Sequence, residues 1–458
     1  MRTVSISKKT TAAESNQLFG IEQADIRRIS ERLQENEKLR ALRDRAWKVV
    51  QTKPRPSRTD EPWRRTDPAR FPYAQVTLGE AEDWRPDRRL VRDLEEAPVG
   101  GTLLNHPGQP SQIWLDPVSQ RAGVIFTDWA TAVLQHTDLL QENLNTIIPV
   151  EEEWFSSLTA AVSEMGGLLY VPKGLQIEHP LRSLLWAPGT GKAFFSRFLV
   201  IVDEGASVEL EHESFSPTEA EGSAFHGGVI EALVRSGGNL KISTVQNWGE
   251  HVWDVTHKRI RVERDAKVEW NSAVFGGQTS KDFSDMDLGG DGAEGLWSGI
   301  YFSQDQQHFD IDTQQNHTYP HTTSDLLYKG ALSGKSRTVW QGMIFVDHAA
   351  QQTDGYQANR NLMLSREARA DSIPGLEIKA DDVRCTHGAT AGDVDKEQLY
   401  YLMSRGLPRE EAKKLVVEGF FSPVLDRITN ETLRYRLKGI IDDKMEQYRA
   451  KRLKTPQP

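Results

Sequence analysis

The sequence has very little cysteine, no long apolar run and no excess of positive charge, and each lack excludes a class of protein. Cys385 is the only cysteine in 458 residues, which excludes an internal disulfide framework and fits a reducing compartment. No apolar run approaches the roughly 18 residues of a membrane span, and the first fifteen residues lack the apolar core of an export signal. We therefore expect a cytoplasmic protein without a membrane partner.

The charge balance argues against a general nucleic-acid partner. The formal net charge is -10, and the basic stretch over residues 27–65 carries 13 Lys or Arg against 6 Asp or Glu. A solvated helix face followed by a linker explains this local excess better than a nucleic-acid site does. The length allows two or three domains, because single cores stop growing near about 250 to 300 residues.

The first region, residues 1–165, mixes helix and strand signals. Apolar residues at three- and four-residue steps predict an amphipathic helix over residues 25–51, which ends before Pro54, Pro56 and Pro62. Farther along, IWLD and AGVIF have the composition of short strands, whereas WATAVLQHTDLLQENL and EEEWFSSLTAAVSEM have that of helices. We expect a helical or α/β N-terminal region.

The second region, residues 166–390, consists of short strand-like runs with tight breaks near Gly205, Gly238, Asp265, Gly334 and Glu367. Several successive breaks have roughly the same spacing along the chain. This spacing falls within the period of about 20 to 50 residues that is typical of repeat proteins. A regular period of this kind, without helices between the strands, is typical of stacked parallel coils. A β-sandwich stays open as the alternative, because short strands with frequent turns suit it equally well.

The third region, residues 391–458, is predicted to be helical. Asp395 and Gln398 form a start that resembles a capping box, Gly406 suits a left-handed C-cap, and Pro408 opens a second helix. A third helix is expected from about Glu431. These helices are too short to form a core of their own, so they must pack on the β region or on a partner.

The segment KADDVRCTHGAT, from Lys379 to Thr390, carries the most specific chemistry, because a histidine follows the single cysteine by two positions. In a strand Cys385 and His387 would share one face, and a thiolate with an imidazole suits zinc or iron. Two donors cannot complete a tetrahedral or cluster site. The spacing alone therefore leaves two interpretations open: a metal site completed from elsewhere, or an inert buried cysteine beside a hydrogen-bonded histidine.

Two glycine motifs resemble nucleotide sites but lack essential parts of them. The run PGTGK ends in Gly191 and Lys192 without the earlier glycine and the following hydroxyl of a phosphate loop. Gly290, Gly292 and Gly295 satisfy G-x-G-x-x-G, yet the strand-like LWSGIYF follows them instead of a helix. We expect no bound nucleotide and no ATP hydrolysis by this chain.

His317 and His321 have the spacing of a helical zinc pair. Pro320 lies between them, however, and the neighbouring threonines favour strand or loop. Hydrogen bonding within the fold is therefore the favoured interpretation of both histidines.

Long runs of the middle and C-terminal regions match one known pattern and cover most of residues 165–425. They are GGLLYVPKGLQIEHPL from Gly166, VDEGASVELEHES from Val202, NHTYPHTTSDLLYKGAL from Asn316, SRTVWQGMIFVD from Ser336, TDGYQANRNLMLS from Thr353, ADSIPGLEIKADDVRCTHGAT from Ala370 and EQLYYLMSRGLPREEAKKLVVEGFF from Glu397. These runs resemble the SufB/SufD family of the SUF iron-sulfur cluster assembly system, and within it SufD.

The resemblance implies a mainly β fold: a right-handed parallel β-helix core flanked by an α/β N-terminal region and a C-terminal helical segment. It also implies a non-catalytic scaffold that pairs with a SufB-like subunit and docks the SufC-like ATPase. The two scaffold subunits would share a transient iron-sulfur cluster. In the absence of SufB, a homodimer is expected.

The resemblance also assigns site residues. In the family's C-S-H-G-A-T type segment the histidine meets a SufB cysteine; here that histidine is His387, with Thr386 in the usual serine position and Cys385 as a weaker candidate ligand. Docking of SufC falls to about residues 395–425, although packing within the chain would account for roughly half of the apolar residues there. The candidate contact residues are Leu407, Leu415, Val416, Phe420 and Phe421.

Two alternatives stay open. A SufB-like subunit is the nearer one, although SufB-like chains carry a glutamate-containing segment in place of CTHGAT and usually more cysteines. A β-helix polysaccharide-active enzyme is the other, since acidic residues at Asp285, Asp287, Asp310 and Asp312 imitate clustered catalytic acids. The C-terminal helices and the absence of an export signal disfavour that enzyme.

Overall fold

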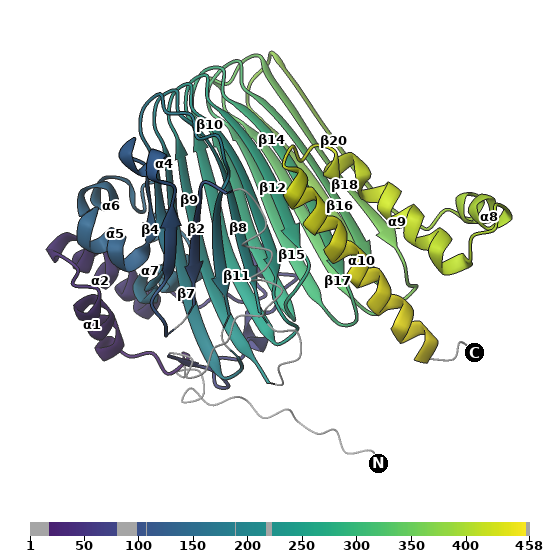
Figure 1. Cartoon of the computed structure of the whole chain (residues 1–458), viewed down its shortest axis with the longest axis horizontal. Coiled ribbons are helices and arrows are strands. Elements are labelled where there is room, and N and C mark those ends of the chain that lie inside the picture. Colours follow the sequence, from purple (N-terminus) through teal and green to yellow (C-terminus); the bar gives the residue numbers. More distant parts are fainter. Residues whose placement is uncertain (1–17, 80–98, 107, 188, 217–221, 455–458) are drawn as a thin grey trace.

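The computed structural model describes residues 18–79, 99–106, 108–187, 189–216 and 222–454. Within these residues the strands form two ten-stranded sheets. Helices from the two ends of the chain lie against this array of strands (Figure 1). No helix of the described ranges is long and apolar enough to cross a membrane. The expectation drawn from the first fifteen residues concerns a segment outside these ranges.

Consecutive strands of the solenoid alternate between the two sheets. Sheet A contains, in spatial order, β4 (Ile125–Asp128), β5 (Met165–Val171), β7 (Lys192–Val202), β9 (Ala224–Val234), β11 (Val252–Val262), β13 (Thr279–Leu288), β15 (His308–His317), β17 (Arg337–Val346) and β19 (Arg369–Ile378), with β1 (Thr77–Leu78) beside β7. Sheet B contains β3 (Gln112–Leu115), β2 (Gly101–Asn105), β6 (Leu181–Trp186), β8 (Ser207–Phe215), β10 (Asn239–Asn247), β12 (Lys267–Val274), β14 (Glu294–Ser303), β16 (Thr323–Leu332), β18 (Thr353–Met363) and β20 (Val383–Asp393).

The pairing pattern confirms a parallel β-helix. Strands two apart in sequence pair in parallel, whereas antiparallel pairing within the described residues occurs at the N-terminal edges, between β2 and β3 and between β4 and β5. A sandwich joins neighbouring antiparallel strands instead. The β-sandwich alternative is therefore wrong.

The length of each coil agrees with the spacing of the breaks in the sequence. Lys267 pairs with Glu294 of the following coil, and Ser207 pairs with Asn239 in the same way. The predicted breaks are tight turns between the sheets, and Gly205 and Gly334 have φ values of 62° and 65°. Glycine adopts this left-handed conformation at no steric cost.

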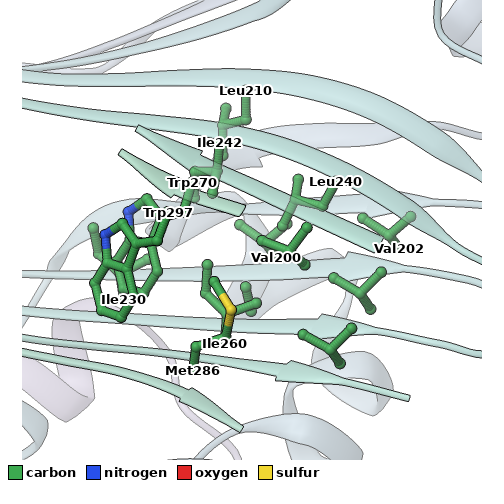
Figure 2. Packing of buried hydrophobic residues seen from close by; sticks show 14 of the residues in the cluster. Val200, Val202, Leu210, Ile230, Leu240, Ile242, Ile260, Trp270, Met286 and Trp297 are labelled. Atoms are coloured by element: carbon green, nitrogen blue, oxygen red, sulfur yellow. The ribbon is translucent and has the colours of Figure 1, made fainter. Parts of the chain in front are cut away.

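The interior between the sheets is filled by apolar side chains that repeat from coil to coil. Figure 2 shows one part of this core, in which Trp270 and Trp297 lie side by side. Their ring centroids are 4.2 Å apart and their planes differ by 6°. Each coil buries its inner face only against its neighbours, so a terminal coil needs a cap.

The N-terminal region packs on the outer face of sheet A. Phe155 and Trp63 belong to the same buried cluster as Phe225 of β9. The helix predicted over residues 25–51 is two helices, because Gln34 adopts φ 54° and the Asn36 side chain accepts a hydrogen bond from the Leu39 amide at 3.0 Å. The helical segments are α1 (Gln23–Arg32), α2 (Glu37–Thr52), η2 (Glu61–Trp63), η3 (Pro68–Arg70), α4 (Pro117–Arg121), α5 (Trp129–Gln135), α6 (Thr137–Asn143) and α7 (Trp154–Val162).

The C-terminal region is helical, as predicted, and comprises α8 (Lys396–Ser404), α9 (Arg409–Leu425) and α10 (Glu431–Lys454). The Asp395 side chain caps α8, and Gly406 follows it with φ 95°. Pro408 lies just before α9 instead of inside its first turn. Helices α9 and α10 share a buried cluster with strands of sheet B, including Phe302. The solenoid therefore carries helices on both sides.

Candidate functional site

The last coil of the solenoid is open at its C-terminal side. Strands β19 and β20 end the two sheets, and each pairs on one edge only within the described residues. Leu376 and Ile378 of β19 stand opposite the fully buried Ile344 and Val346 of the preceding coil, so they belong to the interior face. They are nevertheless 36 % and 40 % exposed. The interior face of the solenoid is thus partly accessible to solvent at this end.

Cys385 and His387 both lie on β20, as the extended reading of the segment predicted. Their partners on β18 are Gly355 and Gln357. Cys385 is half-buried and packs against the small apolar cluster around Ile344. A Cβ atom at Gly355 would lie 3.2 Å from the Cys385 sulfur, so the glycine leaves room for the thiol. This strand face therefore points into the solenoid.

The two donors differ in their surroundings. Burial raises the pKa of the Cys385 thiol, which disfavours the thiolate that metals bind. His387 is exposed on the same face. In the described part of the chain, no three His, Cys, Asp or Glu side chains are grouped so that they could hold a metal ion. His387 and Cys385 could therefore supply only part of a ligand set.

The C-terminal hairpin of α8 and α9 extends beyond the solenoid. Figure 1 shows α8 projecting away from the strands while α9 runs back along them. Leu415 is 44 % exposed, whereas Leu407, Val416 and Phe420 are half-buried. Four of the five predicted contact residues therefore keep some accessible surface.

Phe421 is the exception among the five predicted contact residues. Its side chain is fully buried, and its ring lies 6.4 Å from that of Phe302 on β14. The neighbouring Phe420 is fixed from the same side, because the Lys329 ammonium donates to the Phe420 carbonyl oxygen at 2.6 Å. Phe421 thus helps to hold α9 on sheet B.

The sequence interpretation missed exposed residues of α8. Tyr400, Tyr401 and Met403 are exposed, and Tyr400 reaches 76 %. The buried residue of this helix is Leu399. The signal was present in the run QLYYLMS, which has more large apolar residues than one buried stripe requires. These side chains and Leu415 form what we call the hairpin patch.

The remaining histidine and glycine motifs have structural roles. His317 is fully buried and bonds through Nδ1 to the Thr322 hydroxyl at 2.7 Å and through Nε2 to the Ser324 hydroxyl at 2.8 Å. His321 occupies a turn with φ 57°. Gly295 lies inside strand β14, so the run after the glycine motif is a strand, as predicted.

A buried polar network in the interior was also missed. His226 Nδ1 lies 2.6 Å from Asp254, and its Nε2 lies 2.9 Å from the Ser196 hydroxyl. All three side chains are buried beside a cavity of about 30 Å³, which is room for one or two water molecules. A space of this volume is too small for a substrate. We interpret the network as structural: it gives the buried polar groups of the solenoid interior the hydrogen-bond partners that they need.

The fold and these sites together define a β-helix protein with an uncapped last coil and an exposed helical hairpin. The model of one family, described as "SUF system FeS cluster assembly, SufBD core domain", matches residues 185–420. The chain belongs to this SufB/SufD family of iron-sulfur cluster assembly proteins. The match removes support for the polysaccharide-active alternative.

Individual relatives agree with the family match. The chain is 29% identical over 434 residues to "Iron-sulfur cluster assembly protein SufD" of Bacillus subtilis, across 93% of this chain and 99% of that protein. It is 30% identical over 365 residues to "Iron-sulfur cluster assembly protein SufB" of the same organism, across 78% of each chain. A SufBD family protein of Staphylococcus saprophyticus is 29% identical, again across 78% of each.

Proposed function

We propose that this chain is a SufD-type scaffold subunit that pairs with a SufB-like subunit, docks a SufC-like ATPase and helps to assemble iron-sulfur clusters. The observation that carries this proposal is the open last coil, where His387 lies exposed on the interior face of the final strand of sheet B. A ligand at the end of an uncapped solenoid is positioned to meet a second chain. In this proposal the chain itself is not a catalyst.

The choice of SufD over SufB is supported by coverage. The alignment with SufD of Bacillus subtilis spans 99% of that protein, whereas the alignment with SufB spans 78%. The identities, 29% and 30%, do not separate the two. A SufB-like scaffold is therefore the second candidate, and the partner that this chain selects distinguishes them.

The cluster is cargo in this account, held briefly between two subunits. His387 would bind iron through an unprotonated ring nitrogen, and Cys385 is the weaker ligand because its thiol packs inward. Replacing one thiolate of a cluster by imidazole raises its reduction potential, which suits a cluster that must leave. The other ligands would come from the SufB-like subunit, from sulfide or from a small thiol.

Docking of the ATPase is assigned to the C-terminal region, residues 391–458. Aromatic residues are common anchors of protein interfaces, and the hairpin patch presents Tyr400 and Tyr401 in exposed positions. In this proposal the SufC-like partner supplies the energy of ATP hydrolysis, and this chain binds no nucleotide.

The open edge also suggests how the subunits join. An unpaired strand edge is a template for adding a strand from another chain. We infer a heterodimer with the SufB-like subunit, and a homodimer through the same edge when SufB is absent. A cytoplasmic setting, in which thiols stay reduced, would keep Cys385 available. Neither a nucleic acid nor a membrane has a part in this account.

Affinity purification of the tagged chain from its own cells, followed by mass spectrometry, tests the proposal. We expect SufB-like and SufC-like subunits to copurify in defined stoichiometry. Recovery of a SufD-like subunit in place of the SufB-like one would favour the second candidate. Recovery of neither would contradict both.

A further inference from the structure

A cleft of about 190 Å³ lies where the N-terminal region meets the first residues of the strands of sheet A. Residues 65–71 of the N-terminal region form one wall, and the first residues of β13, β15 and β17 form the other. These two walls come from distant parts of the sequence, and the site described above does not include them.

The cleft is lined mainly by cations and uncharged donors. Arg65, Arg70, Lys335 and Arg337 contribute four positive charges, while Asp67 is the one acidic residue among the described residues that line it. Thr279 and the glutamines at 278, 306 and 307 add neutral donors. A chain with a net charge of -10 thus concentrates positive charge at one concave place.

These cations are only partly neutralised by neighbours. Lys335 pairs with Glu367 at 3.4 Å, but both side chains are about two-thirds exposed, so this pair is weak. Arg337 shares the Asp371 carboxylate with Arg369. Within the described residues Arg65 bonds the neutral amide of Gln341 at 2.9 Å. The cleft therefore keeps a net positive potential.

The walls are fixed before any ligand arrives. Thr66 is buried, donates to Asp310 and lies 2.8 Å from His308 Nε2. The Arg337 guanidinium donates to the Arg65 carbonyl oxygen at 3.4 Å, which joins the two walls directly. A preformed site binds more tightly because less freedom is lost on binding.

We propose that this cleft binds a small phosphate-type oxyanion, either free phosphate or a diphosphate group. Guanidinium groups present planar forks of donors that match phosphate oxygens in pairs. The volume is below the roughly 300 Å³ at which pockets for drug-sized ligands begin, so the site suits one or two phosphate groups better than a whole nucleotide. The proposal does not depend on cluster assembly.

Titration calorimetry of the full chain with inorganic phosphate and with pyrophosphate, at fixed ionic strength, tests this inference. We expect saturable binding that is weakened by about tenfold or more in the Arg70→Ala/Lys335→Ala variant, because two charge-assisted contacts are lost. Both side chains are exposed, so folding should persist. The matched control is Arg264→Ala/Lys267→Ala, an exposed pair at another turn of the solenoid, which should bind like the unaltered chain.

Two outcomes would overturn the proposal. One is the lack of saturable heat from either anion up to millimolar concentration. The other is an equal loss of affinity in the test and control variants, because general charge attraction alone would then explain the binding. Tighter binding of pyrophosphate than of phosphate assigns a diphosphate group to the site, and equal binding assigns a single phosphate.

Discussion

Leu415 and Phe421 lie on the same helix, α9, but on different sides of it: Leu415 is 44 % exposed and Phe421 is fully buried against sheet B. One side of the helix therefore holds it on the solenoid, and the other is free to contact a partner. Substitutions at the two positions should consequently affect different properties.

Leu415→Asp should abolish binding of the SufC-like ATPase while the chain stays folded. A charge desolvated in an interface costs several kcal/mol, and hot-spot losses exceed about 2 kcal/mol. The measurement is the dissociation constant by calorimetry. The control is Leu134→Asp on α5, which is 52 % exposed at the other end of the molecule and should leave binding unchanged. Unaltered affinity of a folded Leu415→Asp variant would refute the assignment of the hairpin patch.

Leu376→Lys/Ile378→Lys should weaken the homodimer and the pairing with the SufB-like subunit. Both side chains lie on the exposed interior face of the last coil, where two added charges would be buried on association. Light scattering at micromolar concentration measures the change. Val118→Lys, at an exposed position of the N-terminal region, is the control. A strict monomer for the unaltered chain, with no SufB association, would show that this edge is not an interface.

Lys281→Met should destabilise the fold strongly. The Lys281 ammonium lies 3.0 Å from Asp310 and 2.8 Å from Asp312, and Lys281 and Asp310 are fully buried. Removal of the cation leaves two carboxylates without their counter-ion, which costs about 3–5 kcal/mol. Urea unfolding gives the change, and the exposed Lys173→Met should alter stability by less than about 0.5 kcal/mol. Equal unfolding midpoints for the two variants would contradict this account of the buried charges.

The fold should lose stability between pH 6.5 and pH 4. Burial lowers the pKa of His317 to about 4, so the unfolded chain binds a proton in this range that the folded chain excludes. The stabilisation is complete above pH 6.5 and disappears as the pH falls, by at most about 1.4 kcal/mol per pH unit for each such histidine. Denaturant unfolding at several pH values gives the free energy of unfolding as a function of pH. Its slope between pH 4 and pH 6.5 should be shallower in His317→Gln than in the unaltered chain. The slope should be unchanged in the control His321→Gln, whose histidine is exposed. Identical slopes for all three proteins would rule out His317 as a source.

The parallel coils could be predicted from the sequence because each turn leaves a local mark. Breaks near Gly205 and Gly334 recur at the spacing that the register later requires. The sequence did not predict that the helix expected over residues 25–51 is divided into α1 and α2, because the apolar residues keep a helical spacing on both sides of the division. Its cause is local, a left-handed Gln34 followed by the Asn36 cap.

The candidate site could be predicted only in part. The shared face of Cys385 and His387 follows from a period of two, which any strand has. The burial of Phe421 does not follow, because α9 has apolar residues on more than one side and only the position of sheet B decides which side is covered. The basic cleft could not be predicted from the sequence either, because Arg65 and Arg337 are far apart in the chain and meet only through tertiary packing.

The central claim is that His387 is a cluster ligand, and the iron and sulfide content of the reconstituted complex tests it most directly. His387→Ala removes an exposed imidazole and little packing, so folding and partner binding should persist while cluster content falls sharply. Cys385→Ser should reduce the content less, because the thiol packs inward. A His387→Ala complex with full iron and sulfide content would contradict the account and leave His387 as an interface residue without a metal role.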